Sequence, residues 1–262
     1  MNDLIKRDNQ IVEFDISKIV LAIATAFESS CGSHSDDYLD NYQTYLRIIS
    51  ELDWPAYLLR SPELHEQVIQ SFFQNNVDEI YTLLFAWCDN DFITSISKQC
   101  KQSSVIKFDR HRIINEATLL FRRGFFHATV SLLIPQLYGI ALDISKYLSN
   151  AQIAIGENNS NLLTTRYKIN NSSDKGQLIS AILAGKELDN LTYEYDLLIG
   201  YLRTKVFSAT LSESDMLAHP NRNLICHGKQ LNYGTKEHAL KAILCTFSLV
   251  KIANVLEEFV SV

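Results

Sequence analysis

The segment FFHATVSLLIPQLYGIALDISKYL, residues 125–148, is apolar on nearly all sides and is interrupted by one proline, Pro135. A helix with this pattern has no polar face to present to water, so other elements must surround it. No apolar run in the chain approaches the roughly 18 residues that a membrane span needs. We therefore expect a central helix, bent at Pro135, inside a helical bundle.

The remainder of the chain favours the same fold class. The 262 residues include only nine glycines and four prolines, which favours helices over a turn-rich β fold. The spacing of apolar residues and the positions of helix-capping residues predict further helices. They lie within 38–102 (with breaks near Trp54-Pro55 and Ser61-Pro62, and a buried helix over 72–88), over 110–124, 177–186 and 189–208, and after Thr235. We predict an all-α fold.

Two domains are expected, with a boundary near residue 105 in the linker KQSSVIKFDR. Residues 1–104 would form a mainly helical domain that opens with a small hairpin and could be regulatory. Residues 105–262 would form a second helical domain with a polar loop at 149–176. The first part holds 7 Lys and Arg against 16 Asp and Glu, and the second holds 17 against 14. A site for a polyanion is therefore expected in the second part.

Several classes of protein are disfavoured. The N-terminus MNDLIKRDNQ lacks the apolar core of a secretion signal, so we expect a cytoplasmic protein with no membrane partner. Five scattered cysteines without a CxxC pair fit neither a disulfide framework nor a zinc site. The net charge of −6 disfavours a protein that coats nucleic acid non-specifically. P-loop, dinucleotide-binding and metalloprotease motifs are absent from the sequence.

The stretch NRNLICHG places Arg222 and His227 five positions apart, with Asn223 between them. Five positions correspond to roughly 140° on a helix, which excludes an i,i+4 zinc pair. We expect a short helix over 220–227, opened by Pro220 and closed by Gly228. An arginine in its first turn interacts unfavourably with the helix dipole, which costs ~0.3–1 kcal/mol of stability. Local stability therefore does not explain why an arginine stands at this position. Instead, the arginine could bind a phosphate while the histidine transfers protons, with the amide between them orienting either one.

The pattern N-R-N-x-x-x-H-G, followed by Y-G-T and A-L-K-A-I-L, resembles the C-terminal motif of HEPN-domain proteins. The upstream segment RHRIINEATLLFRRGFFHATVSLLIPQLYGIALDI is similar to the first helices of such domains. The resemblance covers roughly residues 109–260. Gln136 departs from it, because relatives often have an acidic residue in this helix.

The resemblance implies a metal-independent endoribonuclease without a cofactor, which works as a homodimer with its motifs facing each other. A ribose 2′-OH would attack the adjacent phosphate and leave a 2′,3′-cyclic phosphate. Arg222, Asn223 and His227 would be the catalytic residues. Proteins of this type act as toxins or as antiviral, abortive-infection effectors, so tRNA or mRNA and a partner encoded in the same operon are the expected partners.

Alternatives to this interpretation remain open. The motif residues could be structural, with Arg222 bound to a helix end and His227 capping the short helix. The domain could also be a non-catalytic HEPN module that binds a protein or nucleotide as a scaffold or antitoxin. Basic side chains could guide RNA or form solvated helix ends, namely Arg110, Arg112, Arg122 and Arg123. Tyr233 could stack on a base or pack under the final loop.

The N-terminal segment IKRDNQIVEFDISKIVLAIATAF resembles the opening of an ATP-cone, a nucleotide-sensing module. Lys6, Arg7 and Lys18 match its basic positions, whereas Asn9 replaces its usual glycine. This resemblance implies ATP binding at the N-terminus. The alternative is a hairpin followed by an amphipathic helix, reached by chance.

Overall fold

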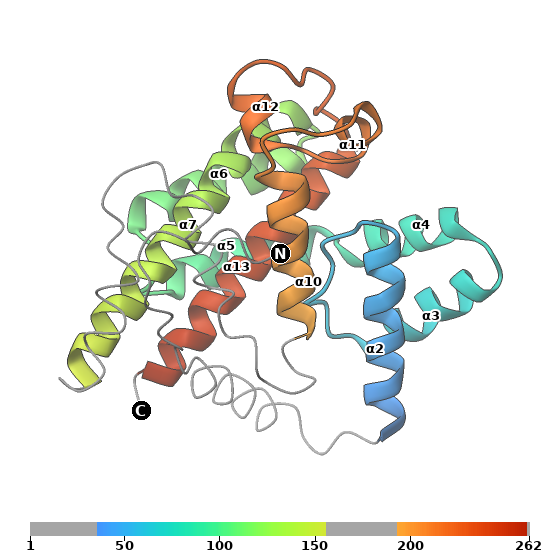
Figure 1. Ribbon diagram of the computed structural model, residues 1–262, viewed down its shortest axis with the longest axis horizontal. Helices are drawn as coiled ribbons and strands as arrows, with labels where there is room; N and C mark the ends of the chain where they lie inside the picture. The colour runs from blue at the N-terminus through green and yellow to red at the C-terminus, as the bar shows by residue number, and fades with distance from the viewer. Residues whose placement is uncertain (1–35, 156–192, 261–262) are drawn as a thin grey trace, which may run out of the picture.

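All regular secondary structure in the described part of the chain is helical (Figure 1). The computed structural model describes residues 36–155 and 193–260, and no strand occurs in these two ranges. The all-α fold predicted from the sequence is therefore confirmed. In chain order the elements are α2 (Asp36–Glu51), α3 (Pro62–Phe73), α4 (Val77–Trp87), α5 (Asn90–Gln102), α6 (Phe108–Arg122), α7 (Phe126–Ile155), α10 (Tyr193–Tyr201), the π-helical turn η1 (Leu202–Val206), α11 (Glu213–Ala218), α12 (Arg222–Cys226) and α13 (Lys236–Val260).

The core forms around two long helices, α7 and α13, which pack against each other (Figure 1). Val130, Leu133 and Ile140 of α7 are fully buried, as expected for a helix that is apolar on all sides. From α13, Ile243 and Val250 meet them in the same core. Burying side chains of this size stabilises the fold by about 1.5–3 kcal/mol each. Helix α6 runs back along α7, and α5 packs on both α6 and α13.

One continuous core joins the two parts of the chain that the sequence divides near residue 105. Buried apolar residues on both sides of this position, such as Ile96 and Ile114, belong to the same cluster. The N-terminal helices α2, α3 and α4 pack on one another in sequence. The boundary itself stays a prediction, and the shared core shows that α5 packs with the C-terminal helices.

Four helices end with the same backbone arrangement, in which one residue adopts a left-handed conformation. These residues are Asp53 (φ 55°), Asn75 (φ 56°), Gly124 (φ 81°) and Gly228 (φ 67°), after α2, α3, α6 and α12 respectively. In each case two backbone N–H groups bond back to carbonyls of the last turn, which defines the Schellman motif. Glycine, or sometimes asparagine, is usual at this position. An aspartate at the end of α2 is therefore notable.

Three predicted boundaries were wrong or need adjustment. The predicted helix over 72–88 is two helices, because Asn75 turns the chain between α3 and α4. Residues 149–155, predicted to open the polar loop, are helical, since α7 continues through Pro135 to Ile155. The short helix predicted over 220–227 covers Arg222–Cys226 only, because Asn221 rather than Pro220 begins it as the N-cap.

Helix α10 connects the N-terminal helices with the segment that carries the NRNLICHG stretch (Figure 1). It continues directly into η1, and α11 and α12 follow at the same end of the molecule. The buried carboxylate of Glu194 in α10 accepts hydrogen bonds from the Tyr42 hydroxyl (2.7 Å) and from the Arg60 guanidinium (2.5 Å). Burial raises the pKa of Glu194, and the Arg60 charge opposes that shift. The start of α10 is therefore fixed to the first helices.

None of the described helices is long and apolar enough to cross a bilayer. The N-terminal hairpin, the helix predicted over 177–186 and most of the polar loop lie outside the described residues.

Candidate functional site

Helix α12 carries the arginine and the histidine at its two ends. Arg222 is its first residue, and His227 follows its last residue as the C-cap. The side chain of Asn221 caps the N-terminus by accepting a hydrogen bond from the Leu224 amide (3.0 Å). Gly228 closes the other end in the left-handed conformation, as predicted. The short helix therefore fixes where both side chains leave the backbone.

The Arg222 guanidinium is oriented by its neighbour Asn223. Its Nη1 donates to Asn223 Oδ1 at 3.0 Å. The Asn223 amide nitrogen donates in turn to the backbone carbonyls of Phe207 (3.2 Å) and Ser208 (3.1 Å). The Nε of Arg222 is covered and has no hydrogen-bond partner within the described ranges. The arginine is thus half-buried and held from one side, and most of its five donors are not used by these contacts.

His227 has the opposite surroundings. Its side chain is exposed, and no hydrogen bond or ion pair of the imidazole occurs with any residue that the structure describes. Only its backbone takes part in the helix end, where its N–H donates to the Asn223 carbonyl (3.1 Å). The ring nitrogens of His227 are therefore available to a ligand or substrate.

These contacts bear on the structural alternative for the motif. Arg222 bonds to the Asn223 side chain, and no bond to a helix end is found for it among the described residues. His227 caps α12 through its backbone, which any residue could do. The capping role considered for His227 is therefore present in its backbone, whereas its imidazole makes no capping contact in the described ranges.

Asn221 fixes the motif to the turn that follows η1, and sequence reasoning missed this role. Its side chain is fully buried, and its amide nitrogen donates to the carbonyls of Lys205 (2.9 Å) and Ser208 (3.1 Å). Ser208 therefore accepts hydrogen bonds from both Asn221 and Asn223. The usable signal was the residue type, because asparagine is among the best N-cap residues.

Gln230 closes the motif segment from the other side and was also missed. Its buried side chain accepts a hydrogen bond from the Asn221 N–H (2.9 Å). Its amide nitrogen donates to the carbonyls of Met216 (2.7 Å) and His219 (2.8 Å). One glutamine thus joins the end of α11, the start of α12 and the loop after it. The sequence offers no local signal for such a long-range contact.

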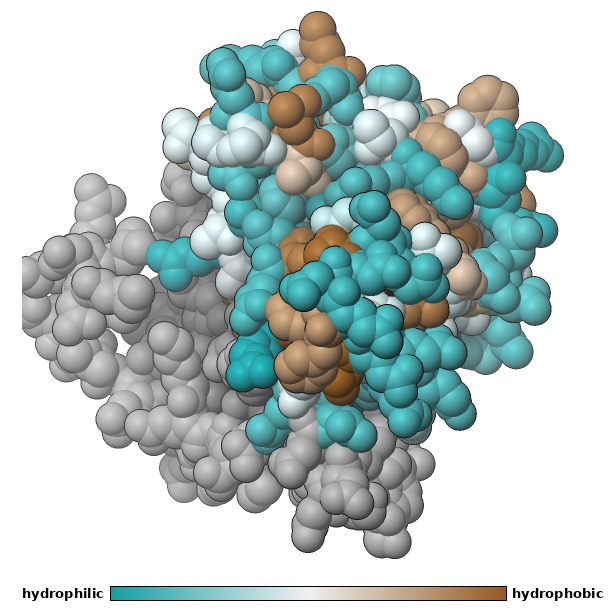
Figure 2. Space-filling view, turned by 90° about the vertical axis from the view of Figure 1, so that its right-hand side faces the viewer, coloured by the Kyte–Doolittle hydropathy of each residue, from teal (hydrophilic) through white to brown (hydrophobic). Residues whose placement is uncertain are grey.

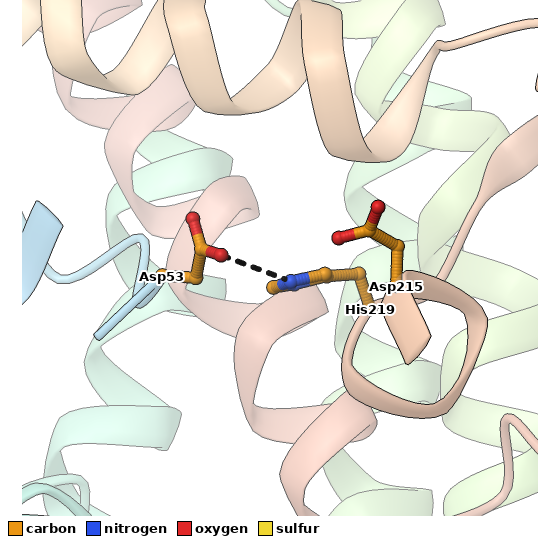
Figure 3. Close-up of side chains that lie close together, drawn as sticks. All are labelled: Asp53, Asp215 and His219. Carbon is orange, nitrogen blue, oxygen red and sulfur yellow. Dashed lines mark ion pairs between the residues drawn. The ribbon is translucent and has the colours of Figure 1, made fainter. Parts of the chain in front are cut away.

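A second group of polar side chains lies between the end of α2 and the segment 205–219, and we call it the junction cluster. It consists of Asp53, Lys205, Asp215 and His219 (Figure 3 shows the two aspartates and the histidine). The Lys205 ammonium pairs with Asp53 (3.0 Å) and with Asp215 (2.7 Å). The Nε2 of His219 lies 3.6 Å from Asp53 Oδ2.

The junction cluster has residue types that bind metals, with ligand atoms of both aspartates and His219 within 4.8 Å of one another. However, the ammonium that bridges both carboxylates already supplies a positive charge. The described contacts therefore form an internal ion-pair network.

Burial and nearby cations keep His219 uncharged. Burial lowers its pKa to about 4, and the Lys241 ammonium adds to this shift, whereas the Asp53 carboxylate opposes it. The other ring nitrogen lies 3.2 Å from the Tyr201 hydroxyl. The hydrogen bond from Lys205 lowers the pKa of Asp215. At neutral pH the cluster therefore holds one cation, two carboxylates and a neutral imidazole.

Arg110, one of the predicted RNA-binding residues, takes part in a network between α6 and α7. Its Nε donates to Asp143 (2.6 Å) and its Nη1 to Gln136 (2.9 Å). The guanidinium lies so close to Gly139 that a side chain at that position would collide with it. Gln136 thus accepts a bond from Arg110, and the carboxylate partner of Arg110 is Asp143, two turns further along α7.

The remaining predicted basic residues are exposed but are not gathered at one place. Arg112 lies near the start of α6, whereas Arg122 and Arg123 lie at its end. At 1.5 Å per residue these two positions are roughly 15 Å apart along the axis. They could border an extended RNA, but they cannot all contact one phosphate.

Tyr233 connects the loop after α12 to α7. Its hydroxyl lies 3.0 Å from the Ser131 hydroxyl, and its ring meets the His127 imidazole edge to face at 5.2 Å. The ring is half-buried. Packing under the final loop, one of the two predicted roles, is consistent with these contacts.

The ATP-cone residues Lys6, Arg7 and Lys18 lie outside the described residues. Comparison with models of protein families, with curated proteins and with solved structures found no match to this chain.

Proposed function

We propose that this protein is a metal-independent endoribonuclease of the HEPN type, with Arg222, Asn223 and His227 in its active site. The contact that carries the proposal is the hydrogen bond from Arg222 to Asn223, whose own amide is fixed by two backbone carbonyls. It holds a guanidinium at one end of α12 while an exposed imidazole occupies the other end. A phosphate-binding group and a proton-transfer group on one short helix suit cleavage of a phosphodiester.

In the proposed reaction, the ribose 2′-OH attacks the adjacent phosphorus and a base removes its proton. The bond to the 5′ oxygen breaks, and an acid protonates that leaving oxygen. The products are a 2′,3′-cyclic phosphate and a 5′-hydroxyl end. His227 would serve as one of the two proton-transfer groups, and Arg222 would stabilise the negative charge that develops on the phosphorane.

The proposal includes a homodimer, because one chain supplies a single motif histidine for two proton transfers. Apolar side chains beside the motif suit such a contact: Leu217 in α11 and Leu231 after α12 are 69% and 76% exposed. The two lie on segments that Gln230 joins through its bond to the Met216 carbonyl. Figure 2 shows apolar side chains standing out at this end of the molecule. A second copy would cover them.

The biological setting follows by analogy with the family that the motif resembles. We propose a toxin or phage-defence effector that cleaves tRNA or mRNA in the cytoplasm and is controlled by a partner protein from the same operon. A non-catalytic HEPN module that binds a protein or nucleotide is the rival, and the following experiment separates the two.

The test compares purified wild type, His227→Ala and Cys226→Ala on an end-labelled RNA and a DNA of the same sequence, in excess EDTA. Cys226 is exposed on the same helix and serves as the matched control. We expect wild type and the control to cleave only the RNA and to leave cyclic phosphate ends. Replacing His227 should lower the rate by about 10²–10⁴-fold with an unchanged circular dichroism spectrum. Wild-type cleavage by the His227 variant, or a dimeric wild type inert on every RNA tested, would contradict the proposal.

A further inference from the structure

Asp53 occupies a position where its backbone disfavours an aspartate. It ends α2 in a Schellman motif at φ 55°, where its N–H bonds to Ser50 and the next N–H bonds to Ile49. Left-handed conformations are disfavoured for residues other than glycine, and asparagine and aspartate tolerate them best. The two equivalent turns after α6 and α12 use glycine. The aspartate at this position is explained by the contacts of its side chain, which a glycine could not make.

The side-chain contacts of Asp53 connect the end of α2 with η1 and with His219 in the C-terminal part of the chain. The Asp53 carboxylate pairs with Lys205 of η1 at 3.0 Å and lies 3.6 Å from His219 (Figure 3). Lys205 has a second partner, Asp215, in α11. The ammonium thus fixes η1 to the end of α2 and to α11 at the same time.

The backbone of η1 and of the residues just after it accepts hydrogen bonds from the motif. The Lys205 carbonyl accepts from Asn221, the N-cap of α12. The carbonyls of Phe207 and Ser208, just beyond, accept from Asn223. Since Asn223 orients Arg222, an uninterrupted set of contacts runs from Asp53 through Lys205 to the guanidinium.

We infer that the ion pair between Asp53 and Lys205 is a positioning contact, through which the N-terminal helices set the geometry of the motif. Neither residue needs to touch the RNA. Lys205 fixes η1, and η1 presents the carbonyls that hold Asn221 and Asn223. The N-terminal part of the chain can therefore influence the motif through this pair. As a statement about catalysis, this inference rests on the proposed function.

Amide hydrogen exchange tests the inference without requiring activity. Asp53→Asn removes the charge and retains a residue that tolerates the left-handed conformation. We expect exchange within 221–230 to become about tenfold faster, while α7 and α13 retain wild-type exchange. Glu51→Gln, an exposed change on the same helix at a residue with no ion pair to any described residue, is the matched control and should leave exchange unchanged. Wild-type exchange in 221–230 of a folded Asp53→Asn variant would overturn the inference.

A second pair of variants covers the case in which Asp53→Asn fails to fold. Lys205→Arg retains the cation and should preserve exchange and cleavage, whereas Lys205→Met should lower kcat about tenfold with KM for RNA within about twofold. Equal behaviour of the two variants would overturn the inference. If the wild type cleaves no RNA, the proposed function fails, and the exchange measurements still decide whether the positioning contact exists.

Discussion

His219 and His227 lie on either side of the same short helix, and their surroundings differ in almost every respect. His219 is 1% exposed, contacts Tyr201 and Asp53, and is kept neutral by burial and by nearby ammonium groups. His227 is exposed and has no side-chain partner among the described residues. The cations differ in the same way: Lys205 has two carboxylate partners, whereas Arg222 bonds only to a neutral amide in these contacts.

This difference separates residues that hold the segment in place from residues that can meet a ligand. A charge that is already paired must give up its partner before it can bind a phosphate, which costs free energy. The guanidinium of Arg222 has no carboxylate to lose in the described contacts. The junction cluster therefore serves the architecture, and the α12 motif is the better candidate for chemistry.

Among the tests of this contrast between the junction cluster and the α12 motif, the largest expected effect concerns Arg222. Arg222→Lys retains the charge but loses the planar donor geometry that binds phosphate through two bonds. We expect the rate of RNA cleavage to fall about 10²–10³-fold, with the free energy of unfolding within about 0.5 kcal/mol of wild type. Single-turnover cleavage and urea unfolding measure the two quantities.

Lys229→Ala is the matched control, because Lys229 is an exposed cation just beyond α12. It should retain the wild-type rate. A stability loss in Arg222→Lys without a rate loss would assign the arginine to the architecture, and the contrast with the junction cluster would disappear.

A smaller effect is expected from pH on His219. Its folded-state pKa is about 4, below the ordinary value of 6.5, so the unfolded chain binds more protons between these values. The stabilising contribution of His219 is therefore complete above pH 6.5 and is lost as the pH falls towards 4. Between pH 7.5 and pH 5.0 the loss amounts to about 2 kcal/mol. His227→Gln changes an exposed histidine outside the junction cluster and serves as the control.

Urea unfolding of wild type, His219→Gln and His227→Gln at both pH values checks this prediction. Subtracting the pH dependence of the unfolding free energy of His219→Gln from that of the wild type gives the contribution of the His219 imidazole. Other acid-sensitive groups, such as Glu194, cancel in this difference. The expected order is a steep slope for wild type and for His227→Gln, and a shallower one for His219→Gln. Equal slopes for wild type and His219→Gln would show that the buried imidazole does not titrate as its surroundings imply.

Much of the fold could be predicted because its signals are local. The all-round apolar pattern of 125–148 predicts a central helix, and Ser61 and Thr235 are N-cap residues that mark helix starts at the observed positions. Gly228 likewise predicts the end of α12. The break at Asn75 was missed because the apolar spacing continues across it and asparagine is an ambiguous turn signal.

The candidate site was predictable only in part, for a physical reason. Arg222, Asn223 and His227 lie within one short stretch, and their residue types suggest their chemistry. The groups that hold them, above all Lys205 and Gln230, act through distant backbone carbonyls. No local pattern encodes such contacts. Arg110 illustrates the converse, since its sequence context suggests a free cation and its partners lie on the neighbouring helix.

The smallest expected effect is the response of the junction cluster to metal ions. Because the Lys205 ammonium already pairs with both Asp53 and Asp215, excess EDTA should move the thermal midpoint of the wild type by less than ~1 °C, and millimolar Mn²⁺ should do no more. In Lys205→Ala the two carboxylates and His219 would lack the ammonium that bridges the carboxylates, so Mn²⁺ should now raise the midpoint measurably. Lys229→Ala, which removes a cation elsewhere, should respond like the wild type. A wild-type midpoint that falls in EDTA and recovers with Mn²⁺ would mean that a metal ion, and not the lysine alone, balances these carboxylates.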